Sequence, residues 1–151
     1  ENGFGDADGL YASLNSRLEE LKKKLSEKEM FNVMRYVKSK GPETVIFTFG
    51  SDGCKGVYGE NTFSLPAMDV PVVDTTGAGD VFHGAFDAAY LNGMDVVSAA
   101  KYATGVSSIK CTEMGGRAGI PDKETLEKFL KTGKIDRSNI IKRVEHYKRG
   151  I

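Results

Sequence analysis

Cysteine is scarce in this chain of 151 residues, which contains only Cys54 and Cys111, and tryptophan is absent. Neither cysteine has a second cysteine close to it in the sequence, as a zinc-binding motif would require. Two isolated cysteines also cannot form the disulfide framework of a small secreted domain, and they are typical of a reducing compartment. We therefore expect neither a zinc site nor structural disulfides, and we expect a cytoplasmic protein.

An excess of charge of either sign is also missing, because 21 basic residues balance 21 acidic ones. Without a clustered basic stripe, nothing favours a nucleic acid as a partner. No apolar run approaches the roughly 18–20 residues that span a bilayer, so no membrane partner is expected either. The chain begins with Glu1 rather than Met, and we expect it to be a piece of a longer chain, a processed product or a trimmed form.

The sequence does contain a succession of helix and strand patterns. Leucines recur at helical spacing from Leu10 to Leu25, and apolar residues over 30–37 predict a second helix that ends before Gly41-Pro42. Residues 44–49 form a β-branched and aromatic run, which predicts a buried strand. Shorter strands are predicted near residues 56–58, 62–65 and 70–73.

The second half of the chain has mostly helical patterns. Helices are predicted over 81–91 and 96–110, with a break at Asn92-Gly93 between them. Asp122 is a candidate N-cap for another helix, and residues 138–148 predict a last short one. Strands that alternate with helices favour an α/β layered domain.

The most informative segment is the turn at residues 74–80, Asp-Thr-Thr-Gly-Ala-Gly-Asp, between a predicted strand and a predicted helix. Its small residues allow backbone N–H groups to approach a ligand closely, and the start of a helix carries about half a positive charge. This combination predicts an anion site. A carboxylate directly behind it, that of Asp80, could accept a proton from a hydroxyl while the amides hold developing phosphate charge.

Two better-known phosphate motifs do not fit this turn. A dinucleotide fingerprint needs a third glycine three positions after Gly79, where this chain has Phe82. A P-loop needs Gly-Lys-Ser or Gly-Lys-Thr, which occurs nowhere in the sequence.

The turn, followed by Gly84-Ala85, resembles the second signature of the ribokinase-like (PfkB-type) sugar kinases. Residues 48–53 resemble the loop of that family that lines the nucleotide, and residues 110–121 resemble the loop that closes over the nucleotide and a monovalent cation. Together the three segments cover roughly residues 44–131 in the family's order. A ribokinase-like enzyme transfers the γ-phosphoryl group of ATP to a hydroxyl of a sugar or sugar acid.

The resemblance implies a role for each matching residue. Asp80 takes the position of the general base, and the amides of Gly77, Ala78 and Gly79 form the anion hole for the phosphoryl group. The positions that match the nucleotide pocket are Thr48, Gly50, Gly53 and Thr75.

The resemblance also implies ATP, Mg²⁺ and K⁺ as cofactors. Asp74, Thr76 and Gly115 match the ligands of a potassium ion beside the anion hole, whereas Gly119 stands where relatives often have a serine ligand. The family orients magnesium through the Glu of an Asn-x-x-Glu motif. The nearest candidate, residues 15–19, is one residue too long, and the magnesium-orienting acid stays unassigned.

The fold implied is the C-terminal half of a ribokinase-like α/β/α sandwich with a Rossmann-like central sheet, without the lid and the N-terminal strands. We expect one partial domain, with a helical leader at 1–43, a nucleotide-binding and catalytic core at 44–131 and a tail at 132–151. A chain of this kind is expected to be inactive alone, and to self-associate or pair with a missing N-terminal half. Two alternatives stay open: a non-catalytic nucleotide-binding or assembly half-domain, and a vestigial kinase fragment.

Overall fold

The structure, a computed structural model, describes residues 25–149. Its first helix, α2 (Glu27–Lys38), begins with a capping box in which the side chain of Ser26 and the side chain of Glu29 each accept a hydrogen bond from the other's backbone N–H. Met30 and Met34 form its buried face. The helix predicted over 30–37 is therefore confirmed, whereas the helix predicted from Leu10 to Leu25 lies almost entirely outside the described residues.

An antiparallel sheet of three strands follows, with β1 (Thr44–Thr48), β2 (Cys54–Tyr58) and β3 (Asn61–Leu65) in the spatial order β1-β2-β3. The short 3₁₀ helix η1 (Gly50–Asp52) joins β1 to β2. These strands confirm the predictions near 44–49, 56–58 and 62–65.

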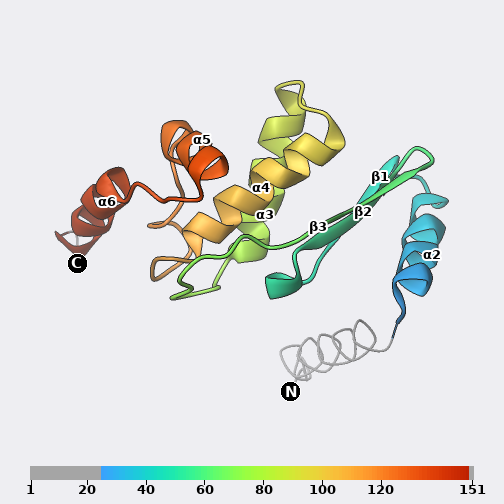
Figure 1. The fold of residues 1–151 in the computed structure, drawn as a ribbon, viewed down its shortest axis with the longest axis horizontal. Coiled ribbons are helices and arrows are strands. Elements are labelled where there is room, and N and C mark those ends of the chain that lie inside the picture. The colour runs from blue at the N-terminus through green and yellow to red at the C-terminus, as the bar shows by residue number, and fades with distance from the viewer. Residues whose placement is uncertain (1–24, 150–151) are drawn as a thin grey trace, which may run out of the picture.

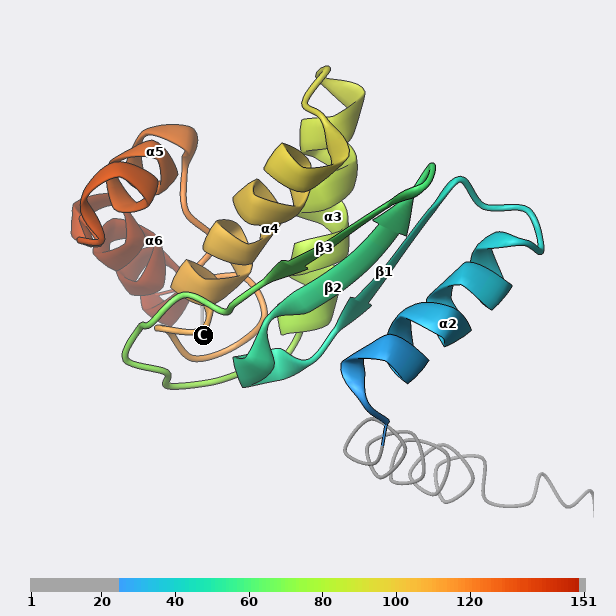
Figure 2. The ribbon, with the colours of Figure 1, turned by 45° about the vertical axis from the view of Figure 1, so that its right-hand side comes forward.

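Helices cover both faces of this sheet, as expected, because side chains alternate between its two sides (Figures 1 and 2). On one face, Val45 and Val57 pack with the buried methionines of α2. On the other face, Cys54 and Phe63 pack against the helical pair described next.

That pair consists of α3 (Ala78–Leu91) and α4 (Val96–Lys110), which fold back on each other in a helical hairpin. Asp95 caps α4 by accepting hydrogen bonds from the N–H groups of Val97 and Ser98 at 3.0 Å. Because α3 and α4 run in opposite directions, the last turn of α4 lies beside the first turn of α3. Ser107 of α4 donates a hydrogen bond to the carbonyl of Ala78 at 2.9 Å.

The prediction of a strand at 70–73 is wrong: the segment forms no strand in the described part of the chain. Pro71 has no N–H to donate to a ladder, and Val72 and Val73 are 60% and 57% exposed. The N–H groups of Val73 and Asp74 both donate to the carbonyl of Cys111, at 2.8 and 3.1 Å. The segment is thus tied to the end of α4 and not to a neighbouring strand.

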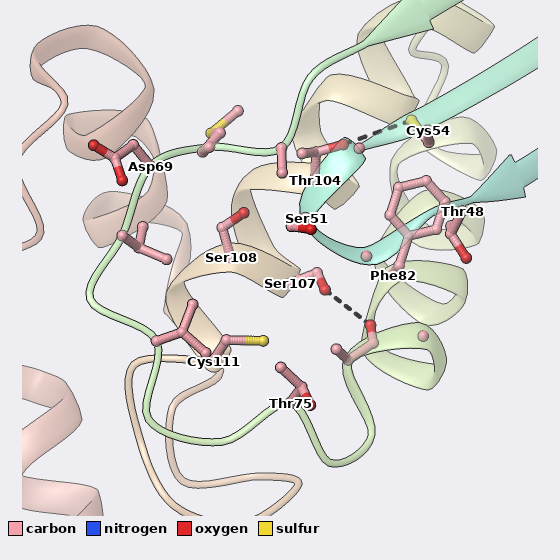
Figure 3. A pocket seen from close by; sticks show the side chains of 18 residues that line it. Thr48, Ser51, Cys54, Asp69, Thr75, Phe82, Thr104, Ser107, Ser108 and Cys111 are labelled. Carbon is pink, nitrogen blue, oxygen red and sulfur yellow. Dashed lines mark hydrogen bonds between the residues drawn. The ribbon is translucent and has the colours of Figure 1, made fainter. Parts of the chain in front are cut away.

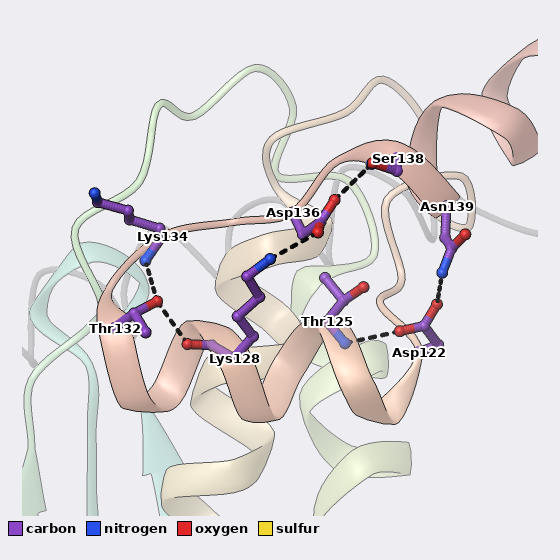
Figure 4. Close-up of polar contacts among 8 residues, drawn as sticks. All are labelled: Asp122, Thr125, Lys128, Thr132, Lys134, Asp136, Ser138 and Asn139. Atoms are coloured by element: carbon purple, nitrogen blue, oxygen red, sulfur yellow. Dashed lines mark hydrogen bonds and ion pairs between the residues drawn. The ribbon is translucent and has the colours of Figure 1, made fainter.

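Two further helices, α5 (Lys123–Thr132) and α6 (Ser138–Arg149), complete the described chain beside α4, on the side away from the sheet (Figure 1). Asp122 caps α5 by accepting from the N–H of Thr125 at 2.8 Å, as predicted, and its other oxygen accepts from Asn139 of α6 at 2.9 Å (Figure 4). Lys128 and Asp136 form an ion pair at 2.9 Å across the connection, and this contact lowers the pKa of Asp136. These polar contacts fix α6 against α5.

Candidate active site

A cavity of about 620 Å³ lies where the turn after β1, the segment 67–72, the first turn of α3 and the last turns of α4 meet (Figure 3). Part of its wall is apolar, from Ala67, Met68, Val70, Val72 and Phe82. Another part carries hydroxyl groups, from Thr48, Ser51, Thr75, Thr104, Ser107 and Ser108. A wall that is apolar with a few polar groups is typical of a small-molecule site, and the volume lies within the usual range for one.

The structure brings together most of the site residues predicted from the sequence. Six of them line the cavity: Thr48, Gly50, Gly53, Thr75, Ala78 and Gly79. The other five do not line it: Asp74, Thr76, Gly77 and Gly115 belong to loops, and Asp80 belongs to the first turn of α3. Segments that are far apart in the sequence therefore meet at one place in the fold.

The turn after β1 is tight because of Gly53. Its φ of 85° lies in the left-handed region, and a Cβ at this position would come within 2.0 Å of the carbonyl oxygen of Leu65. The carbonyl of Gly53 accepts a hydrogen bond from Phe49 at 2.8 Å. Only glycine allows this turn to lie so close to β3, and the close packing brings Thr48 and Gly50 to the cavity wall.

The first turn of α3 begins at Gly77, which has a φ of 71° and provides no side-chain cap. The N–H of Ala78 donates to the carbonyl of Thr75 at 3.0 Å. For the N–H groups of Gly77 and Gly79, no acceptor is found within residues 25–149. Two of the three amides assigned to the anion hole are therefore available to a ligand, whereas the third is already paired.

Three other helices have a side-chain cap at their N-terminus, whereas α3 has none. Side chains of Ser26, Asp95 and Asp122 accept hydrogen bonds from the first N–H groups of α2, α4 and α5. At α3, a Cβ added to Gly79 would meet no atom within 4 Å other than the nearby backbone of its own helix. The start of α3 thus combines unpaired donors with open space on the cavity wall, which suits an anionic ligand.

Asp80 lies in the first turn of α3, directly after Gly79, and its side chain is exposed. Asp74 has a different role in the loop, because its two carboxylate oxygens accept from the N–H groups of Thr76 at 2.9 Å and Gly115 at 2.7 Å. The hydrogen bonds from Thr76, and then that from Gly115, lower the pKa of Asp74 to about 2. This carboxylate fastens the loop before α3 to the loop that follows α4.

Sequence reasoning missed Lys110, the last residue of α4. Its side chain is 0% exposed, and its ammonium donates to the carbonyl of Asp74 at 2.9 Å and to the carbonyl of Thr76. In the sequence, a lysine at the end of a helix is expected simply to complement the helix dipole. The lack of any charged residue between Tyr102 and Lys110 was the only sign that this part of α4 is buried.

The residues at the expected potassium site do not fit a bound potassium ion. The carbonyl of Thr76 is occupied by the ammonium of Lys110. The N–H of Gly115, whose carbonyl was expected as a ligand, donates to Asp74. Both oxygens of that carboxylate already accept backbone hydrogen bonds.

The family model described as pfkB family carbohydrate kinase matches residues 15–123 of this chain. The chain belongs to this family. Ribokinase of Bacillus subtilis (strain 168) is 33% identical over 89 residues, which are 59% of this chain and 30% of that protein.

Comparison with two solved structures shows that this pfkB chain has the ribokinase-like α/β fold. The structure of Arabidopsis thaliana ribokinase complexed with ribose and ATP matches 70% of this chain and 35% of that one, with a TM-score of 0.66 and 27% identity. A putative ribokinase II from E. coli in complex with ATP and Mg²⁺ matches 72% and 34%, with a TM-score of 0.62 and 27% identity. The pfkB chain spans about a third of the length of each relative named.

Among residues 25–149, no helix is long and apolar enough to cross a membrane.

Proposed function

We propose that this chain carries the nucleotide-binding and phosphoryl-transfer part of an ATP-dependent sugar kinase. The observation that supports this most is the start of α3, where the amides of Gly77 and Gly79 have no acceptor in the described chain and Gly79 borders the cavity. Ribokinase of Arabidopsis thaliana has been solved with ribose and ATP, which supports the same choice of ligands here. All predicted site residues lie within residues 44–131, which we propose as the catalytic core.

The nucleotide is proposed to occupy the cavity with its phosphates directed toward α3. The apolar wall suits the adenine base, and the hydroxyl groups of Thr48 and Thr75 offer hydrogen bonds to the polar parts of ATP. The donors at the start of α3 then face the γ-phosphate. The amide of Ala78 joins them only if its hydrogen bond to Thr75 opens.

Asp80 is proposed as the general base. Its carboxylate accepts the proton of the attacking sugar hydroxyl as the oxygen forms a bond to the γ-phosphorus. The bond from that phosphorus to the oxygen that bridges it to the β-phosphate breaks, and ADP leaves with this oxygen. The amides of Gly77 and Gly79 stabilise the negative charge on the transferring group.

Magnesium is compatible with this arrangement. No group of three or more His, Cys, Asp or Glu that could hold a metal ion is found in the described part of the chain, and Asp69 is the one carboxylate on the cavity wall. Mg²⁺ in kinases is held mainly by nucleotide phosphates, water and one or two carboxylates, and it would neutralise phosphate charge. Asp69 is therefore the carboxylate of this wall that we propose would help to hold Mg²⁺.

The 151-residue chain alone is proposed not to complete the reaction. In the described structure β1 lies at an edge of the three-stranded sheet, where a further strand or a second chain could be added. We expect the complete gene product to release ADP in a sugar-dependent manner, and the isolated chain to release none.

A coupled assay of ADP release, with pentoses, hexoses and ketogluconate-type acids, tests this proposal. The background without sugar is the reference, and size-exclusion chromatography shows whether the isolated chain self-associates. A gene product that binds ATP but responds to no sugar alcohol or acid would favour a non-catalytic nucleotide-binding module. Sugar-dependent turnover by a monomer of the isolated chain would contradict the proposed incompleteness.

A further inference from the structure

We propose that the ammonium of Lys110 is a built-in cation for the phosphate-binding turn, and that the turn therefore needs no monovalent metal ion. The family resemblance places a potassium ion beside this turn, but the backbone oxygens there are bound by a side chain of the chain itself. The catalytic meaning of this inference rests on the proposed kinase function. The structural claim, that Lys110 takes the place of a bound ion, does not depend on the kinase function.

Lys110 is buried, and two hydrogen bonds to backbone carbonyls hold its charged ammonium in place. Its side chain is among the largest fully buried ones in the described structure. A buried ammonium is costly unless its donors are satisfied, and two of its three N–H groups are directed at the carbonyls of Asp74 and Thr76. The carboxylate of Asp74 belongs to the same loop, and the charge of Lys110 contributes to lowering its pKa.

These hydrogen bonds also determine the direction of the anion-binding amide. A trans peptide unit is planar, so its C=O and N–H groups point in opposite directions. Because the carbonyl of Thr76 points at Lys110, the N–H of Gly77 in the same peptide unit points away from it. Lys110 is thus a positioning residue, which holds the peptide so that its donor is presented on the opposite side.

Lys110 also provides a positive charge close to a cavity wall that has no basic side chain of its own. Of the described residues that line the cavity, none is Lys or Arg. A phosphate group at the start of α3 would carry negative charge, and a fixed positive charge behind the turn stabilises it without a bound ion.

The glycine at position 119 is also consistent with a lysine ammonium in the place of an ion. Gly119 offers no side-chain oxygen to an ion, and a Cβ there would come within 2.4 Å of the carbonyl oxygen of Lys110 and 2.9 Å of its Cα. The loop after α4 therefore packs directly on the backbone of Lys110. A second cation placed among the same oxygens would be repelled by the ammonium.

Thermal unfolding of the 151-residue chain in potassium, sodium and choline chloride at equal ionic strength tests the proposal. We expect the same midpoint in all three salts for the wild type. Lys110→Ala removes the cation and leaves room for an ion. Its midpoint should fall by at least about 4 °C in choline, and potassium should restore at least half of that loss. Lys110→Met fills the space without charge and should lose stability that potassium does not restore.

Lys101→Ala is the matched control, because Lys101 lies on the same helix with its side chain exposed. It should melt like the wild type in every salt. A potassium-specific rise in the wild-type midpoint would overturn the proposal, and so would a Lys110→Ala variant that melts like the wild type or loses stability that potassium cannot restore.

A titration of the wild-type chain with thallium(I), followed by thallium NMR, gives a readout that needs no folded variant. We expect no saturable binding, and saturable binding that potassium displaces would overturn the proposal. Neither measurement depends on turnover. A gene product without kinase activity would therefore contradict the proposed function alone.

Discussion

Replacing Asp80 by asparagine should lower kcat by at least ~10²-fold in the proposed kinase. The substitution keeps the shape of the side chain and removes the group that accepts the proton of the sugar hydroxyl. Nucleotide affinity should change little, because the proposed contacts of the phosphates are made by the amides of Gly77 and Gly79. An effect on kcat with nearly unchanged nucleotide binding identifies a group that acts in the transition state.

Asp87→Asn is the matched control for this substitution. Asp87 lies on the same helix, is also exposed and does not line the cavity. Steady-state kinetics of the two variants, with thermal midpoints to exclude unfolding, separates loss of a base from loss of a surface charge. An Asp80→Asn enzyme that retains half of its activity would rule out the base assignment.

Gly79→Ala should stabilise the chain and impair the enzyme at the same time. In a helix interior alanine is favoured over glycine by about 0.5–1 kcal/mol, and a Cβ at position 79 would touch no atom within 4 Å other than the nearby backbone of its own helix. The same methyl group would occupy space on the cavity wall, where a phosphate is proposed to approach the backbone. We expect kcat/KM to fall by at least about tenfold, which corresponds to a loss of about 1.4 kcal/mol of transition-state stabilisation.

Gly84→Ala provides the control, because Gly84 lies in the same helix, also has open space at its Cβ position and is not part of the cavity wall. It should raise the midpoint without changing kcat/KM. Equal kinetics for the two alanine variants would mean that the space at Gly79 is not used by a substrate.

Local patterns were sufficient for most of the fold. The β-branched run at 44–49, the break at Asn92-Gly93 and the cap at Asp122 each correspond to a boundary in the structure. The valines at 70–73 were misleading because their composition is that of a strand. A strand also needs a partner with matching donors, and here the N–H of Val73 bonds to the end of α4.

The site was predictable where a single segment contains it and less so where it depends on long-range contacts. The turn at 74–80 indicated an anion site because glycines and a helix start are adjacent in the sequence. The pairing of the Ala78 amide depends on the local turn geometry, which composition does not specify. The contact of Lys110 with Thr76 joins residues 34 positions apart, and no local pattern predicts that this lysine turns inward.

The central claim is that phosphate binds at the start of α3, and backbone amide NMR of the isotope-labelled 151-residue chain tests it most directly. Titration with a non-hydrolysable ATP analogue is compared with titration with adenosine, which has no phosphates. We expect both ligands to shift the amide signals of Thr48 and Gly53, and only the ATP analogue to shift those of Gly77 and Gly79 strongly and saturably. Equal shifts of Gly77 and Gly79 with both ligands, or no shift with either, would contradict the account.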